Sequence, residues 1–192
     1  MSFEELRPFP SSLVHIRLFH FSEDPAIAKF DPRPVQVASD RPAGREWLNG
    51  PLVWAIEESH QRLYLFPREC PRILLWATPK TTAEDAVRWL EGKPKQALAY
   101  IEREWLERLQ QARTIRYELP SATFHDTRDA GMWVSRTTVY PLDKVTLTDL
   151  PARLAEGGTE LRVVDSLLPW KDVWNSTVHA SGIRLRNAKG WN

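Results

Sequence analysis

Prolines mark out the segments of this chain more clearly than any other residue type. The sequence has 15 prolines in 192 residues, and each one removes a backbone N–H and fixes its own φ angle. Two compact apolar runs lie beside them: LVWAI (52–56) follows Pro51, and RILLWA (72–77) lies between Pro71 and Pro79. Short apolar runs bounded in this way are typical of buried strands.

Period-two alternation predicts further strands, and helical spacing predicts the helices between them. Alternation occurs in LVHIRLFHF (13–21), TIRYELP (114–120), MWVSRTTVYPLDKVTL (132–147) and TELRVVDSL (159–167). Short helices are expected at 57–66, 83–92, 147–158 and 170–183, the second capped by Thr81 or Thr82 and the third ended by Gly157-Gly158. This order predicts one compact α+β domain, residues 1–192, with a mixed or antiparallel sheet and the opening strand at its centre.

A longer helix is expected over 95–112. Its apolar residues recur at spacings of three and four, the pattern of a helix with one buried face. They are Leu98, Ile101, Trp105 and Leu109. We expect this stripe to pack against a sheet or another helix.

Charge and cysteine content limit the partners and the compartment. The net charge is +1, from 26 basic and 25 acidic residues, so no strong binding to nucleic acid is expected. Cys70 is the only cysteine, which excludes an intramolecular disulfide and agrees with a reducing compartment. The start of the chain does not resemble a secretory leader, and no window of 18 uncharged apolar residues follows. We therefore expect a cytoplasmic protein without a membrane span.

Two features bear on the chemistry of a site. The common motifs of nucleotide-binding proteins, zinc proteases and esterases are absent, and an ordinary polar turn accounts for His125-Asp126, so no metal is expected. His20 ends the opening strand and shares one face of it with Ser22. An imidazole there can bind a ribose hydroxyl or a phosphate. The alternative is that His20 is structural and that Ser22 caps the turn at Asp24-Pro25.

Arginines in loop-like and terminal segments offer forked contacts to phosphate. They are Arg33, Arg68, Arg72, Arg184 and Arg186. If the tail is extended, Arg184 and Arg186 share a face that His179 could join. Each arginine has the alternative of being solvated or paired with a carboxylate. Nine tryptophans can serve the core, a partner surface or base stacking alike.

Four blocks of the sequence resemble a family of uncharacterised bacterial proteins. These blocks are LFHFSEDPAIAKFDPRP (18–34), REWLNGPLVWAIEESHQRLYLFPRECPRI (45–73), AGMWVSR (130–136) and STVHASGIRLRNAKGW (176–191). The resemblance spans most of the chain and implies kinship without an activity.

A weaker resemblance is to the ADP-ribosyltransferase fold, through LFHFS (18–22). It implies that His20 holds a ribose hydroxyl of NAD, and that the strand at 52–56 followed by Tyr64 supplies an aromatic beside the nicotinamide. The glycine that follows the histidine in that fold is Phe21 here. Glu118 and Glu160 are the candidates for the glutamate that orients the ribose during transfer.

These observations predict a pocket for an adenine nucleotide, ADP or NAD, and an ADP-ribosyltransferase-like enzyme is one form of this function. No catalytic residue is assigned. The expected contacts are His20, Ser22, Arg33, Trp54, Tyr64, Arg68, His179 and Arg184. The alternative is a non-enzymatic interaction protein with a surface rich in Trp and Arg.

Overall fold

The computed structural model describes residues 16–38 and 40–191. Its strands form two sheets with short helices between them, which confirms the expected α+β class. The chain divides into two compact units: Met1–Gln61 with Ile115–Thr146, and Arg62–Thr114 with Leu147–Asn192. The expectation of a single domain stays a prediction.

The first unit contains a six-stranded sheet in the order β6-β7-β2-β1-β5-β8. Its elements are β1 (Leu18–Ser22), η2 (Glu46–Asn49), β2 (Val53–Glu57), η3 (Glu58–Tyr64, which continues into the second unit), β5 (Thr114–Leu119), η5 (Ser121–Thr123), β6 (His125–Asp126), β7 (Met132–Ser135) and β8 (Asp143–Leu147). Strand β1 lies between β2 and β5 and is antiparallel to both. The predicted central place of the strand ending near His20 is confirmed; the first residues of the predicted segment, 13–15, lie outside the described residues.

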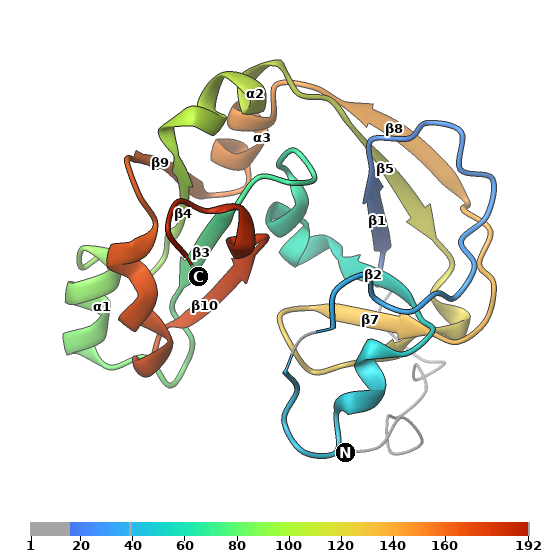
Figure 1. Ribbon diagram of the computed structural model, residues 1–192, viewed down its shortest axis with the longest axis horizontal. Coiled ribbons are helices and arrows are strands. Elements are labelled where there is room, and N and C mark those ends of the chain that lie inside the picture. The colour runs from blue at the N-terminus through green and yellow to red at the C-terminus, as the bar shows by residue number, and fades with distance from the viewer. Residues whose placement is uncertain (1–15, 39, 192) are drawn as a thin grey trace. The chain divides into compact units, whose positions relative to one another are not determined.

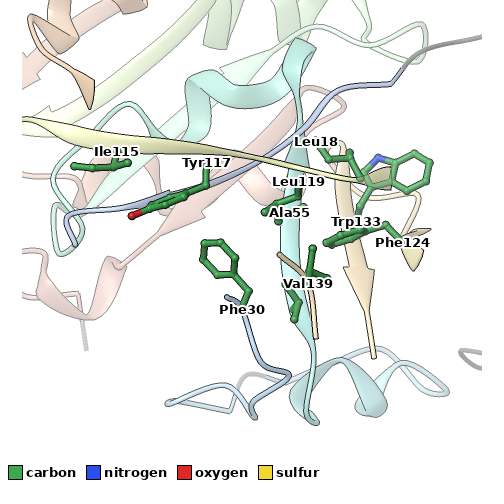
Figure 2. Close-up of a cluster of buried hydrophobic side chains, with 10 residues drawn as sticks. Leu18, Phe30, Ala55, Ile115, Tyr117, Leu119, Phe124, Trp133 and Val139 are labelled. Atoms are coloured by element: carbon green, nitrogen blue, oxygen red, sulfur yellow. The ribbon is translucent and has the colours of Figure 1, made fainter. Parts of the chain in front are cut away.

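One face of this sheet carries the core of the first unit, drawn in Figure 2. Leu18, Ala55 and Tyr117 come from three neighbouring strands, and Phe30 packs edge-on against the Tyr117 ring at 5.3 Å. The Tyr117 hydroxyl donates to the carbonyl of Asp24 at 2.7 Å, which ties the turn after β1 to the core.

The second unit contains a four-stranded sheet in the order β10-β3-β4-β9. Its elements are β3 (Arg72–Trp76), α1 (Ala83–Leu90), β4 (Ala97–Glu102), η4 (Arg103–Trp105), α2 (Leu106–Gln111), α3 (Leu150–Glu156), β9 (Thr159–Val164), η6 (Leu168–Asn175), β10 (His179–Ile183) and η7 (Leu185–Asn187). Strands β4 and β9 run parallel, and the other pairs are antiparallel. Figure 1 shows β3 and β4 inside this sheet, where both faces need apolar side chains.

Local signals placed two helices correctly. Helix α1 begins after Thr82, whose hydroxyl accepts the backbone N–H of Asp85 at 3.2 Å, as its predicted cap requires. Helix α3 ends at Gly157, the first of the two glycines that predicted its stop.

The long helix expected over 95–112 was wrong in its first half. Residues 97–102 form β4, and only Leu106–Gln111 is α-helical. All six residues of β4 are buried, because β3 and β9 flank it and both of its faces are covered; the apolar spacing that suggested a helix therefore reflects burial on two sides. The stripe itself is buried as predicted, with 0 to 8% exposure at Leu98, Ile101, Trp105 and Leu109.

The helix expected over 170–183 was also wrong at its end. Residues Leu168–Asn175 form a 3-10 helix, and His179–Ile183 is strand β10. This segment pairs with β3 along its whole length, from His179 beside Trp76 to Ile183 beside Arg72. Backbone hydrogen bonds to a sheet edge outweigh a weak helical preference.

Candidate functional site

Strand β3 places a buried cation and an aromatic ring on one face of the second sheet. Arg72 and Trp76 lie on the same face of β3, because side chains alternate along a strand. Ile73 and Leu75 face the opposite side, where they join the core of this unit. Arg72 and Trp76 are four residue steps apart along the strand, which corresponds to about 13 Å. His179 of β10 lies directly beside Trp76.

Arg72 is a buried cation held by backbone carbonyls. Its side chain is 2% exposed, and it donates to the carbonyl oxygens of Leu63 and Cys70, each at 2.9 Å. The guanidinium also lies 4.9 Å from the Phe66 ring and 5.9 Å from the Tyr64 ring. Burial lowers the pKa of Arg72 to about 10, so the group stays charged at neutral pH. The predicted contact Tyr64 therefore packs against a fixed positive charge.

The carboxylate of Glu69 contacts three side chains, forming ion pairs with two arginines and accepting hydrogen bonds from Arg186 and Asn187. Arg184 Nε lies 3.2 Å from Oε1, and Arg186 Nη2 and Asn187 Nδ2 lie 3.0 and 3.1 Å from Oε2. Burial raises the pKa of Glu69, but the Asn187 hydrogen bond and the charges of Arg184, Arg186 and Arg68 outweigh it and hold the pKa below its usual value. The Glu69 side chain is 45% exposed. Solvent therefore reaches this group of donors.

A tight turn presents these donors to Glu69. Arg184 has a φ of 57°, in the left-handed region that non-glycine residues seldom adopt, and it begins η7. The N–H of Asn187 donates back to the carbonyl of Arg184 at 2.9 Å, and Arg184 Nε lies 3.3 Å from the carbonyl of Arg68. The tail is not extended as supposed, and Arg184 and Arg186 converge because the chain turns.

We call Arg68, Arg72, Arg184 and Arg186 the arginine cluster. The charges of Arg184, Arg186 and Arg68 lower the pKa of Glu69, and the charges of Arg184 and Glu69 act on the pKa of Arg72. Four guanidinium charges and one carboxylate leave a local charge of +3, whereas the whole chain has a net charge of +1. The second unit therefore has a strongly positive region in an otherwise balanced protein.

The other end of this strand pair carries an aromatic stack, formed by Trp76 and His179 with Arg62. The Trp76 and His179 rings stack at 4.2 Å with 22° between their planes. The Arg62 guanidinium lies 5.0 Å from the Trp76 ring, and burial lowers the pKa of Arg62. His179 thus belongs with Trp76 and lies at the other end of β10 from Arg184.

In the first unit, His20 is fixed by the backbone of β2. Its Nδ1 lies 2.9 Å from the carbonyl oxygen of Trp54. A carbonyl can only accept, so the ring carries its proton on Nδ1, and Nε2 is the acceptor nitrogen of the neutral ring. The ring also packs against Phe30 at 4.6 Å. The pairing of β1 with β2 ends at Phe19 and Ile56, so the His20 side chain reaches the carbonyl just beyond the paired residues.

Ser22 and Arg33 have local roles. The Ser22 hydroxyl is buried and accepts the N–H of Asp24 at 3.1 Å, which is the turn-capping role left open by the sequence. Arg33 exchanges backbone hydrogen bonds with Leu52, at 3.4 and 3.2 Å, and its side chain is exposed.

The indole of Trp54 lies on the opposite face of the sheet from His20. It packs with Leu48 and Val134, whereas Val53 on the same strand faces the other core. Its Nε1 is buried without an acceptor in the part of the chain that the structure describes. His20 therefore contacts the backbone of Trp54, and its ring does not share a face with the indole.

The eight predicted contacts are thus divided equally between the units. Tyr64, Arg68, His179 and Arg184 belong to the second unit, and His20, Ser22, Arg33 and Trp54 to the first. The sequence reasoning missed Glu69, Trp76 and Arg62. Glu69 could have been suspected from its place between Arg68 and Cys70-Pro71, but its partners are more than a hundred residues away in the chain.

The two glutamates suggested by the ADP-ribosyltransferase resemblance are paired with arginines. Glu118 binds Arg17, and Glu160 binds Arg162, in each case at 2.7 Å. Within residues 16–38 and 40–191, no group of three or more His, Cys, Asp or Glu side chains could hold a metal ion. No helix of the described chain is long and apolar enough to cross a membrane.

Comparison with known families matches residues 19–188 to DUF6886, a family of unknown function. The chain belongs to this family. No curated protein and no solved structure shows significant similarity to it. The arginine cluster lies within the matched range, so it is part of the region that defines this DUF6886 member.

Proposed function

We propose that this DUF6886 protein binds an adenine nucleotide, ADP or NAD, through the arginine cluster and the aromatic stack of its second unit. One observation carries the proposal: two side-chain donors, Arg186 and Asn187, and the guanidinium of Arg184 converge on the half-exposed carboxylate of Glu69 within the arginine cluster. Phosphate oxygens accept the same donors, and arginine forks match their geometry.

The aromatic stack supports a nucleotide over a simple phosphate. Trp76, His179 and Arg62 are of the aromatic and cationic types that bind bases in other proteins. They lie on the strand pair that carries Arg72, about 13 Å along β3. A nucleotide has a base at one end and phosphates at the other. The base suits the aromatic stack, and the phosphates suit the arginine cluster.

The resemblance to the ADP-ribosyltransferase fold supports a more specific form, in which NAD is the substrate and its ADP-ribosyl group is transferred. In this form the resemblance implies a ribose contact for His20, which belongs to the first unit and stays a prediction for that unit alone. Ser22, Arg33 and Trp54 stay predictions of further contacts. The diphosphate binding argued from the second unit does not depend on transfer.

Removal of one arginine tests the proposal. Arg184→Ala should weaken ADP binding about 10- to 100-fold in isothermal titration calorimetry, because a charged donor to phosphate is lost. Arg103→Ala is the matched control, since Arg103 is a 66%-exposed arginine of the same unit that binds Asp165. Equal losses in the two variants would show only the effect of net charge and would argue against a site at the cluster.

The alternative is an interaction protein, and one patch favours it. Trp174 and Leu168 of η6 are 44% and 38% exposed, and the Trp174 ring lies 6.0 Å from that of Trp191. Tryptophan fluorescence separates the two functions, because ADP or NAD should change the emission only if a nucleotide binds. No change at millimolar nucleotide would favour the interaction protein.

A further inference from the structure

We infer that Glu69 occupies the position of a ligand phosphate and is displaced when the ligand binds. The inference rests on the proposed nucleotide function. It names Glu69 as the residue that selects among ligands by their negative charge. Glu69 is the acidic side chain on which Arg184, Arg186 and Asn187 converge.

The contacts of Glu69 are those that a phosphate group makes. Oε2 accepts hydrogen bonds from both Arg186 and Asn187, and Oε1 forms an ion pair with Arg184, whose Nε lies 3.2 Å away. Two oxygens thus share the contacts of three side chains. A terminal phosphate has three acceptor oxygens and more negative charge, so it satisfies the same donors with an oxygen for each one.

Glu69 can leave without opening the core. Its side chain is 45% exposed, and those of Arg184 and Arg186 are 31% and 43% exposed. Arg72 is 2% exposed and is held by backbone carbonyls, so its charge stays in place. The exchange therefore requires only a rotation of Glu69 into solvent.

The exchange selects for highly charged ligands. A carboxylate ligand supplies one negative charge, the same as Glu69, and gains little by replacing it. A diphosphate supplies about two charges within NAD and about three when its end is free, as in ADP. Because the charges of Arg68, Arg184 and Arg186 act on the displaced position, the additional charge favours the diphosphate. We therefore assign ligands with a diphosphate to this position and exclude simple carboxylates.

Neutralising Glu69 tests this inference. In Glu69→Gln the competing charge is gone while the size and one acceptor oxygen remain, so inorganic pyrophosphate and ADP should each bind about tenfold more tightly than to the wild type. Glu160→Gln is the matched control, since Glu160 is an arginine-bound glutamate of the same unit outside the cluster. It should leave both affinities within about twofold. Glu69→Ala removes the same charge and should also tighten binding.

The outcomes separate this inference from the proposed function. If Glu69 only positions the arginines, Glu69→Gln and Glu69→Ala bind pyrophosphate more weakly than the wild type, and the inference is overturned. Equal affinities in the wild type and both variants overturn it as well, while leaving nucleotide binding intact. If neither the wild type nor any variant binds ADP, the proposed function itself fails. Melting temperatures identify any variant that has lost its fold. The affinity of the other Glu69 variant then decides whether the inference holds.

Discussion

The side chain of Arg72 donates a hydrogen bond of 2.9 Å to the backbone carbonyl of Cys70, two residues earlier in the chain. Pro71 lies between them and has no N–H of its own to contribute. The same guanidinium reaches Leu63, so one side chain ties the end of η3 to the start of β3. The buried member of the arginine cluster is thereby fixed in place.

Arg72 should be needed for stability. Arg72→Met leaves two buried carbonyls without their donor, so the free energy of unfolding should fall by about 2 to 4 kcal/mol. Urea denaturation measures this change, with the exposed Arg103→Met as the control. A loss no larger than that of the control would show that water replaces the guanidinium at no cost.

Glu102 should anchor the C-terminal segment. Its buried carboxylate accepts the N–H of Leu167 at 3.2 Å and the N–H of Lys189 at 3.1 Å. Glu102→Gln removes the charge that strengthens these hydrogen bonds and replaces the oxygen Oε2, which shares the Lys189 N–H, by an amide nitrogen that cannot accept, so the free energy of unfolding should fall by about 1 to 3 kcal/mol. The exposed Glu104→Gln is the control for calorimetric melting. Equal melting temperatures of the two variants would contradict this role.

Glu57 should make the stability depend on pH. Burial raises its pKa, but hydrogen bonds from Ser59, His60 and Trp133 outweigh it, and the pKa of Glu57 lies below its usual value of 4.5. A carboxyl with a lowered folded pKa contributes stability above its unfolded pKa and loses it as the pH falls through the folded value.

Glu57→Gln provides the comparison. Between about pH 5 and pH 3, the wild type should lose more stability than Glu57→Gln does, because the variant has no proton to take up at this position. Thermal melts across this range measure the difference between the two proteins. If the melting temperatures of the two proteins fall equally with pH, Glu57 does not cause the pH dependence.

His20 should affect both stability and binding. His20→Ala removes the hydrogen bond to Trp54 and the contact with Phe30, so the free energy of unfolding should fall by about 1 to 3 kcal/mol. A ribose contact of His20 within the first unit, as the ADP-ribosyltransferase resemblance implies, adds a loss of nucleotide affinity of about 5-fold to 150-fold. If the folded variant binds ADP as well as the wild type does, His20 is structural only.

The sequence predicted the elements with clear local boundaries. Prolines bound β2 and β3, Thr82 caps α1, and Gly157 ends α3. It failed for 97–102, because burial on both faces of a strand can imitate helical spacing. Apolar spacing alone does not distinguish a helix with one buried face from a strand that is buried on both faces.

The site was predictable only in part. Arg68, Arg184 and His179 were chosen from their loop-like or terminal places, but their partners depend on the pairing of β3 with β10. Glu69 meets Arg186 across 117 residues of chain, and no local pattern announces such a contact. The residue types of the site are therefore visible in the sequence, whereas their convergence on Glu69 requires the fold.

The ratio of ADP affinity to adenosine affinity tests the central claim most directly. Both ligands carry the base and the ribose, and only ADP carries the phosphates that the arginine cluster would bind. Isothermal titration calorimetry on the wild-type protein should show ADP binding at least about tenfold more tightly, with the difference shrinking as salt is added. Equal affinities for ADP and adenosine would contradict a diphosphate site at Arg184 and Glu69.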